Sequence, residues 1–230
     1  MSARQTPDLN MDVGELPDEP AALWALAHRV NIACGGHAGD RDSIADACRR
    51  ARGHRARVGA HPSYPDREHF GRVALDLSPE ELHATVLAQC AFLAVVARSE
   101  GVPVSHVKPH GALYHRADRD PVVARAFLDA ARGVFPKVAL LGPPGGELQR
   151  AARRARLPFL REGFADRGYR PDGSLVPRGE PGDLLTDPAV VASQARALLA
   201  SGRYDTLCLH GDTPGALTLA LAVRRVLDGG

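Results

Sequence analysis

Four histidines and one lysine in this sequence stand directly after short apolar runs. They are His37, His61, His110 and His210, and Lys108 closes the run that precedes His110. Imidazole exchanges protons near neutral pH and also ligates metals. A lysine at the end of a strand can act as a tuned acid or bind an oxygen that becomes negative. These side chains therefore indicate acid–base chemistry or metal-assisted chemistry at one shared site.

Carboxylates and other polar groups recur at the same places. Asp12 and Glu15 follow the first apolar run, and Asp8 and Asn10 lie inside it. A buried carboxylate is costly unless it is paired, so Asp8 should be either hydrogen-bonded or functional. Further polar residues follow later runs: Asp40, Asp66, Glu162, Asp166, Arg167 and Asp212.

The apolar runs themselves predict buried strands. Seven segments fit this description: 8–13, 30–32, 58–60, 104–107, 138–141, 158–160 and 206–209. Helices are predicted between them. Four helix starts are predicted, at Ser78-Pro79-Glu80-Glu81, Asp120-Pro121, Asp187-Pro188 and Thr213-Pro214. Helices with weaker end signals are predicted over 20–28, 42–53 and 146–156. The segment 166–185 is rich in Gly, Pro and Asp, which predicts a long loop or hairpin.

Strands that alternate with helices about seven times are typical of a parallel β/α architecture. In closed barrels of this class the active site lies at the C-terminal ends of the strands. Six of the seven predicted strands deliver polar, titratable residues there. We therefore expect one domain over residues 1–230, a seven-stranded parallel TIM-like β/α barrel with these side chains around its rim.

Composition excludes several function classes. The chain has 230 residues and a formal net charge of +2, so nothing favours nucleic acid or an anionic membrane as a partner. No run of 18 apolar residues is present, and the start lacks the apolar core of a signal peptide. The four cysteines are scattered without a CxxC pair. We expect a cytoplasmic protein with reduced cysteines.

A glycine-rich segment, 142–146, could be mistaken for a phosphate-binding loop. It reads Gly-Pro-Pro-Gly-Gly and lacks the lysine and Ser/Thr of a nucleotide-binding P-loop. The sequence therefore gives no support for an ATP site within this chain.

Eight ordered motifs resemble those of the LamB/YcsF family and span most of the chain. They are DLNMDVGE (8–15), NIACGGHAGD (31–40), GAHPSYPD (59–66), FGR (70–72), VKPHGALY (107–114), FADRGY (164–169), LVPR (175–178) and CLHGD (208–212). Two segments depart from the family pattern: 16–19, and the shortened stretch between Ser201 and Thr206. The resemblance implies a distorted seven-stranded β/α barrel similar to polysaccharide deacetylases.

The resemblance also implies an activity, namely ATP-dependent opening of 5-oxo-L-proline to L-glutamate together with partner subunits B and C, which would handle ATP. On this basis Asp12 or His61 would be the base and His110 the acid, while Lys108 and Arg167 would hold carboxylate or phosphoryl oxygens. The expected substrate-binding residues are Asp8, Asn10, His37, Asp40, Asp166, Arg167, His210 and Asp212.

Two other functions use the same rim. A stand-alone metal-dependent amidohydrolase or deacetylase would bind a divalent metal through Asp12, His37 and His61. It would work without ATP or partners. A non-catalytic binding or assembly protein would keep its ligand after loss of Asp12 and Lys108. The sequence alone does not decide which metal, if any, is bound, or how the chain oligomerises.

Overall fold

Seven parallel strands close into a barrel in the structure, a computed structural model that describes residues 7–16 and 19–229. In chain order they are β1 (Asp8–Val13), β2 (Arg29–Ala33), β3 (Arg57–His61), β4 (Val104–Val107), β5 (Ala139–Gly142), β6 (Phe159–Phe164) and β7 (Thr206–His210). Each strand pairs with the next along the chain, and β1 pairs with β7 to close the ring. The predicted seven-stranded β/α barrel is confirmed.

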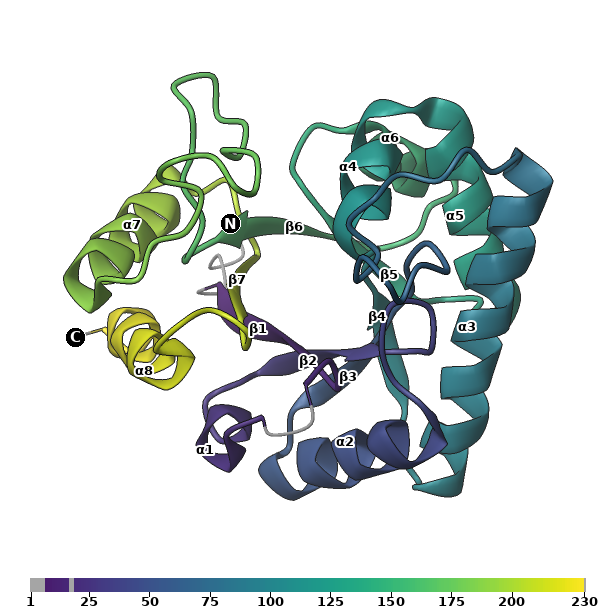
Figure 1. Ribbon diagram of the computed structural model, residues 1–230, viewed down its shortest axis with the longest axis horizontal. Helices are drawn as coiled ribbons and strands as arrows, with labels where there is room; N and C mark the ends of the chain where they lie inside the picture. The colour runs from purple at the N-terminus through teal and green to yellow at the C-terminus, as the bar shows by residue number, and fades with distance from the viewer. Residues whose placement is uncertain (1–6, 17–18, 230) are drawn as a thin grey trace.

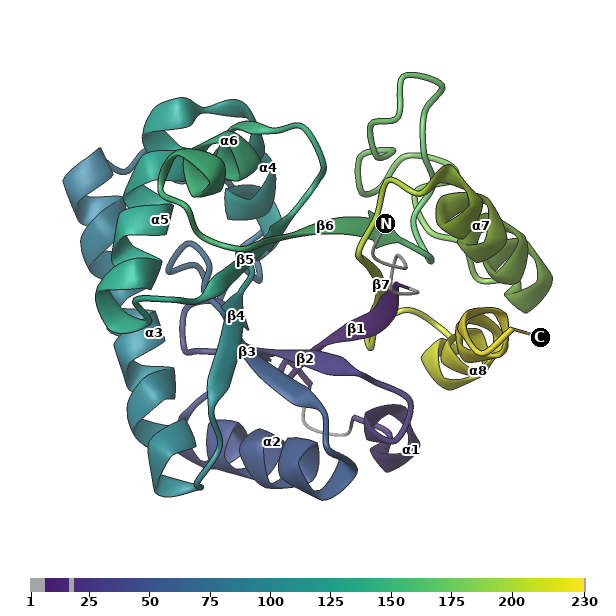
Figure 2. The same cartoon turned by 180° about the vertical axis from the view of Figure 1, so that it is seen from behind.

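Eight helices surround this barrel in the described residues (Figures 1 and 2). They are α1 (Ala21–Trp24), α2 (Arg41–His54), α3 (Pro79–Ser99), α4 (Gly111–Arg119), α5 (Pro121–Val134), α6 (Glu147–Arg154), α7 (Pro188–Ser201) and α8 (Ala216–Leu227). The helices cover the outside of the strands, so the apolar core lies between the two layers.

The predicted helix starts are mostly confirmed. The Ser78 hydroxyl accepts from the Glu81 amide, and the Glu81 carboxylate accepts from the Ser78 amide, which completes a capping box at α3. Two predictions need correction. The helix expected over 20–28 is the four-residue α1, because the chain turns into β2 at Arg29. The sequence pattern also missed α4, a nine-residue helix whose first residue, Gly111, has a positive φ of 58°.

Polar side chains fill the barrel interior beneath its C-terminal end. The Asn31 amide donates to Asn10 at 2.8 Å and to Asp12 at 2.7 Å, and its carbonyl contacts His106 at 2.9 Å. Gly59 makes this possible, because a Cβ there would lie 2.2 Å from His106 Nε2. The interior therefore supports Asp12 from below with hydrogen bonds.

The segment 166–185 folds back on itself beside α7 and forms part of the barrel mouth (Figure 1). Isolated antiparallel bridges join Arg167 to Leu184 and Tyr169 to Leu175. The predicted long loop or hairpin is therefore confirmed.

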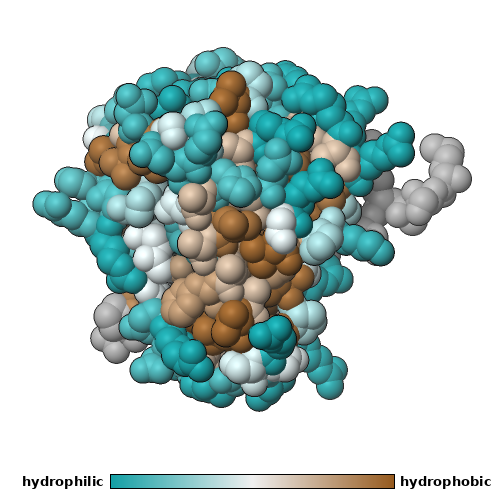
Figure 3. All heavy atoms as spheres, turned by 90° about the vertical axis from the view of Figure 1, so that its right-hand side faces the viewer, coloured by the Kyte–Doolittle hydropathy of each residue, from teal (hydrophilic) through white to brown (hydrophobic). Residues whose placement is uncertain are grey.

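The outward face of α3 is apolar, and it forms much of the brown area in Figure 3. Phe92 and Val95 are 37% and 50% exposed on this face. By length and composition alone, α3 could cross a membrane. Its other face packs into the barrel through buried side chains such as Leu82, Val86 and Leu93, so α3 is a structural helix of the barrel.

Candidate active site

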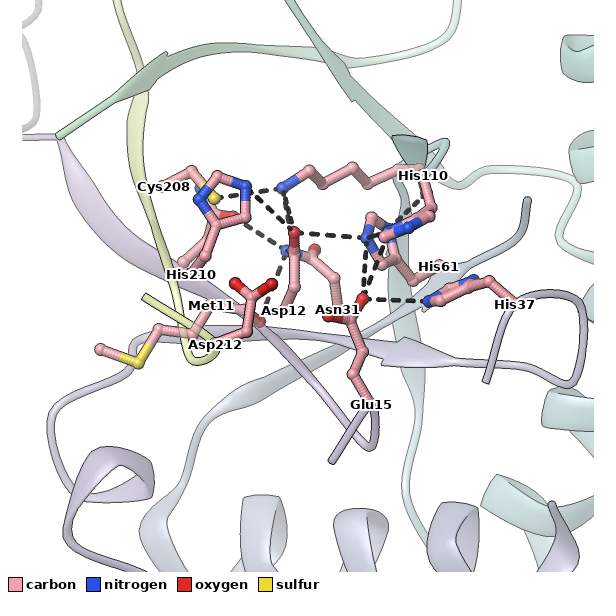
Figure 4. Close-up of polar contacts among 12 residues, drawn as sticks. Met11, Asp12, Glu15, Asn31, His37, His61, His110, Cys208, His210 and Asp212 are labelled. Atoms are coloured by element: carbon pink, nitrogen blue, oxygen red, sulfur yellow. Dashed lines mark hydrogen bonds and ion pairs between the residues drawn. The ribbon is translucent and has the colours of Figure 1, made fainter. Parts of the chain in front are cut away.

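Most of the polar residues expected at the strand ends converge at the C-terminal mouth of the barrel. Figure 4 shows Asp12 at the centre, with His61 and His110 on one side and Cys208 and His210 on the other. Each comes from a different part of the barrel: Asp12 from β1, His61 from the end of β3, His110 from the start of α4, and His210 from the end of β7. Parallel strands place their C-terminal ends together, which explains why residues so distant in sequence meet here.

Lys108 lies between two buried carboxylates. Its Nζ is 2.8 Å from Asp12 Oδ1 and 3.0 Å from Glu162 Oε1, and it contacts Cys208 Sγ at 3.2 Å. Burial alone would lower the pKa of Lys108, but Asp12, Cys208 and Glu162 raise that pKa well above its ordinary value. The side chain is only 2% exposed and stays charged. Lys108 is therefore a fixed positive charge at the floor of the site.

Asp12 is held ionised by its neighbours. Burial pushes the pKa of this carboxyl up, but the charges of His61 and Lys108 outweigh that effect and leave it well below the ordinary value. Glu15 behaves similarly: burial raises its pKa, while hydrogen bonds to His110 and His37 lower it by more. Two carboxylates therefore face the same small space.

His61 and His110 each have one ring nitrogen bound to a backbone carbonyl. His61 Nδ1 lies 2.9 Å from the Lys108 carbonyl oxygen, and His110 Nε2 lies 2.9 Å from that of Phe70. A carbonyl can only accept, so this nitrogen carries a hydrogen in each ring. The remaining nitrogens, His61 Nε2 and His110 Nδ1, face each other at 3.0 Å.

His37 supports this pair from behind. It stacks on His110 with ring centroids 3.6 Å apart, and its Nε2 donates to Glu15 Oε1 at 3.0 Å. Burial lowers the pKa of His37 to about 4, so the ring is neutral. Its one hydrogen is then used on Glu15, which orients that carboxylate.

His210 is paired with Asp166, a different carboxylate from those beside His37, His61 and His110. Its Nδ1 lies 3.0 Å from Asp166 Oδ2, and Asp166 also accepts from the Thr213 hydroxyl at 2.7 Å. Burial favours the neutral ring, but the charge of Asp166 outweighs it and raises the pKa of His210. His210 is thus the ring at this site best suited to carry a second proton.

A pocket of about 630 Å³ opens above these residues. Phe164 forms part of its wall and stacks on His210, with the rings 6° from parallel. Its outer part carries positive charge from five arginines: Arg72, Arg116, Arg119, Arg167 and Arg178. An acid–base floor beneath a cationic mouth suits a small anionic molecule.

Some expected substrate residues lie elsewhere. Asp8 is at the N-terminal end of β1 and pairs with Arg29 at 2.6 Å, away from the mouth. Asp40 is the exposed N-cap of α2. Asn10 lies below Asp12 in the barrel interior, hydrogen-bonded to Thr206 at 2.9 Å.

Other expected residues act on the pocket wall. Asp212 accepts from Arg72 at 2.7 Å and so positions an arginine of the mouth. Arg167 lines the pocket, but its guanidinium donates to the carbonyl oxygens of Asp183 and Val176. Arg167 therefore uses these hydrogen-bond donors to hold the 166–185 loop in place, where they would otherwise face a ligand.

Sequence reasoning left three residues of this site without a role. Glu15 and Glu162 were noted only as polar residues near strands, and Arg72 only as part of a motif. Glu162 and Phe164 lie two residues apart in β6 and therefore share one face of the strand, which was the register signal available. Its pairing with Lys108 depends on how the barrel closes and has no sequence signature.

Comparisons with known proteins agree with this geometry. The chain matches the description "LamB/YcsF family" over residues 7–229. It is 43% identical over 240 residues to the A subunit of the 5-oxoprolinase of Methylococcus capsulatus, and the match covers 97% of this chain and 92% of that protein.

Two solved structures resemble this fold to different degrees. A lactam utilization protein from Thermus thermophilus superposes with a TM-score of 0.90 at 39% identity, covering 97% of this chain and 96% of that one. A family 4 carbohydrate esterase from Streptomyces lividans has a TM-score of 0.53 at 10% identity, covering 98% of this chain and 88% of the other. The second likeness concerns the fold alone.

Proposed function

The chain belongs to the LamB/YcsF family, and we propose that it is the A subunit of a 5-oxoprolinase that opens the lactam of 5-oxo-L-proline to L-glutamate. The observation that carries this proposal is the pocket itself, where Lys108 and Asp12 lie buried beneath an arginine-lined mouth. The names of a 43% identical relative and of a structural neighbour support the lactam as substrate.

ATP and partner subunits enter the proposal because a five-membered lactam is a poor electrophile. Phosphorylation of its oxygen by ATP on partner subunits B and C would activate the ring carbon. The 142–146 loop is not a cradle for the nucleotide, since it packs Gly146 against Asp118, a carboxylate that would repel phosphate. The arginines at the mouth suit the phosphorylated substrate, which carries phosphate and carboxylate charges.

The reaction can be written with its atoms balanced. Water loses a proton and attacks the activated carbon, and the tetrahedral intermediate breaks its carbon–nitrogen bond to leave an acyl phosphate. A second water hydrolyses this acyl phosphate, which releases phosphate and leaves the side-chain carboxylate of glutamate. The ring nitrogen takes up a proton and becomes the amine of glutamate. Lys108 stabilises negative charge near the floor. Asp12 and the ring nitrogens His61 Nε2 and His110 Nδ1 lie where water would be activated.

We assign the proton for the ring nitrogen to His210. The sequence favoured His110 for this role, but the hydrogen of His110 is used on the Phe70 carbonyl. Asp166 raises the pKa of His210, and the ring lines the pocket. His210 is therefore the better donor.

Reconstitution tests the proposal. The chain, mixed with subunits B and C of the same source, should convert 5-oxoproline and ATP to glutamate, and the chain alone should not. His210→Gln should reduce turnover by roughly 100-fold, whereas His54→Gln, at the exposed C-terminal end of α2, should leave it nearly unchanged. Robust ATP-independent turnover by the chain alone would replace this proposal with a stand-alone amidohydrolase.

The same site is expected to operate in the cytoplasm, where ATP and the partner subunits would be available. A stand-alone metal-dependent amidohydrolase is the second candidate function, since the carboxylate and histidine donors at the floor favour a cation.

A further inference from the structure

Four acceptor atoms meet at the floor of the pocket. His61 Nε2 lies 3.0 Å from His110 Nδ1 and 3.3 Å from Asp12 Oδ2, and Glu15 Oε1 lies 3.2 Å from His110 Nδ1. In its neutral form each imidazole has one hydrogen, and that hydrogen is committed to a backbone carbonyl. In that form two lone pairs and two carboxylate oxygens face one another with no donor among them. Such an arrangement is repulsive unless a cation or an added proton stands between the four atoms.

We infer that Asp12, Glu15, His61 and His110 bind a divalent transition-metal ion. Ligand atoms of these four residues all lie within 4.8 Å of one another, the spacing that one ion needs. Two imidazoles with two carboxylates suit a first-row ion such as Zn²⁺ or Fe²⁺, while Mg²⁺ and Ca²⁺ prefer oxygen ligands alone.

The groups behind the four ligands have the arrangement that metal sites use. A metal-binding histidine generally donates its second ring nitrogen to a carbonyl or carboxylate, which fixes the tautomer. His61 and His110 both do so here. The carboxylate ligands are supported too: Asn31 donates to Asp12 at 2.7 Å, and His37 donates to Glu15 at 3.0 Å.

This ligand set revises the metal site expected from sequence, which was Asp12, His37 and His61. His37 is displaced because its hydrogen points to Glu15, and its other nitrogen has no hydrogen-bond partner among the described residues. Glu15 and His110 take its place.

The inference deepens the proposed function without depending on it, because metal binding is measured on this chain alone. When bound, the ion would supply Lewis-acid activation of water or of the lactam oxygen. The lone pairs of His61 and His110 would then be occupied. His210 would remain the proton donor, and Lys108 would remain the fixed charge.

Metal titration of the chelator-treated chain is the direct test. Zn²⁺ should bind at one equivalent per chain and raise the melting temperature, and Co²⁺ should give the visible absorption of a site with nitrogen and oxygen ligands. His61→Gln and His110→Gln should each weaken Zn²⁺ binding by more than ~100-fold. His37→Gln, which supports Glu15 only, should weaken it by about 10- to 100-fold. His115→Gln should bind as the unaltered chain does.

Several outcomes would overturn the inference. If the unaltered chain binds far less than one equivalent of Zn²⁺ or Co²⁺, a proton shared by the two imidazoles replaces the metal. If His61→Gln and His110→Gln keep full affinity, the ion lies elsewhere. The Co²⁺ spectrum of the unaltered chain remains decisive even if a variant fails to fold. Loss of 5-oxoproline turnover in reconstitution would leave the metal result standing.

Discussion

Replacing Lys108 by methionine should lower the free energy of unfolding at neutral pH. This loss of stability should be smaller in acid. Methionine has nearly the same length and can fill the space of the lysine stem. It removes the charge that lies 2.8 Å from Asp12 and 3.0 Å from Glu162. Both carboxylates are buried, at 4% and 2% exposure, so water cannot take over the role of the ammonium.

The magnitude follows from these distances. At an effective dielectric of ~20, a unit charge at 2.8–3.0 Å interacts with each carboxylate by about 6 kcal/mol. Much of that attraction offsets the cost of burying the charges. Removing one member of a buried ion pair typically costs about 3–5 kcal/mol. For a chain of 230 residues this corresponds to a fall in melting temperature of roughly 6–20 °C.

The assay is chemical and thermal unfolding of the metal-free chain across pH. Asp12 is ionised in the unaltered protein, and in the variant its charge is less compensated, so protonation relieves the strain as pH falls. The stability deficit of Lys108→Met should therefore shrink in acid. Lys137→Met, at the only other lysine and on the surface, is the matched control and should show no deficit. A Lys108→Met deficit that is absent, or equal at every pH, would refute the buried ion pair as described.

Three further changes test other parts of the site. Asp166→Asn should lower the free energy of unfolding most below pH 6.5, because folding raises the pKa of His210. The stabilisation from the His210–Asp166 pair is complete below the pKa that His210 has in the unfolded chain, and it is lost as pH rises through the pKa in the folded protein. The difference in unfolding free energy between the variant and the unaltered chain should therefore narrow at alkaline pH. Gly59→Ala should cost about 1–3 kcal/mol in urea unfolding, since its Cβ would lie 2.2 Å from His106 Nε2. Arg178→Ala should raise the KM of the reconstituted enzyme by roughly 10-fold with little change in kcat, and an unchanged KM would remove this arginine from substrate binding.

The alternation of elements was readable from sequence because its causes are local. Strand periodicity, the Ser78–Glu81 capping box and the proline at the first turn of α3 act within a few residues. The parallel order then places all strand C-termini at one end, so the positions of His61, Lys108, His110 and His210 along the chain were enough to group them. Local signals did not predict the short length of α1 or the presence of α4, because tertiary packing decided where those helices begin and end.

Depth along the barrel was decided only by the tertiary structure. Asp8 and Asp12 share one face of β1, yet four residues at about 3.3 Å each separate them by ~13 Å. One therefore pairs with Arg29 at the far end while the other meets Lys108. Sequence types could not make that distinction.

Contacts across the barrel were likewise beyond the sequence. Glu162 reaches Lys108 because β4 and β6 lie two strands apart in a ring whose closure depends on every strand register. The proton positions on His61 and His110 depend on carbonyls of Lys108 and Phe70, which folding alone brings to those rings. The sequence by itself placed His61, Lys108, His110 and His210 at the C-terminal ends of the strands. Only the closed barrel decided which of them are charged, which are neutral, and which lone pairs are left to bind.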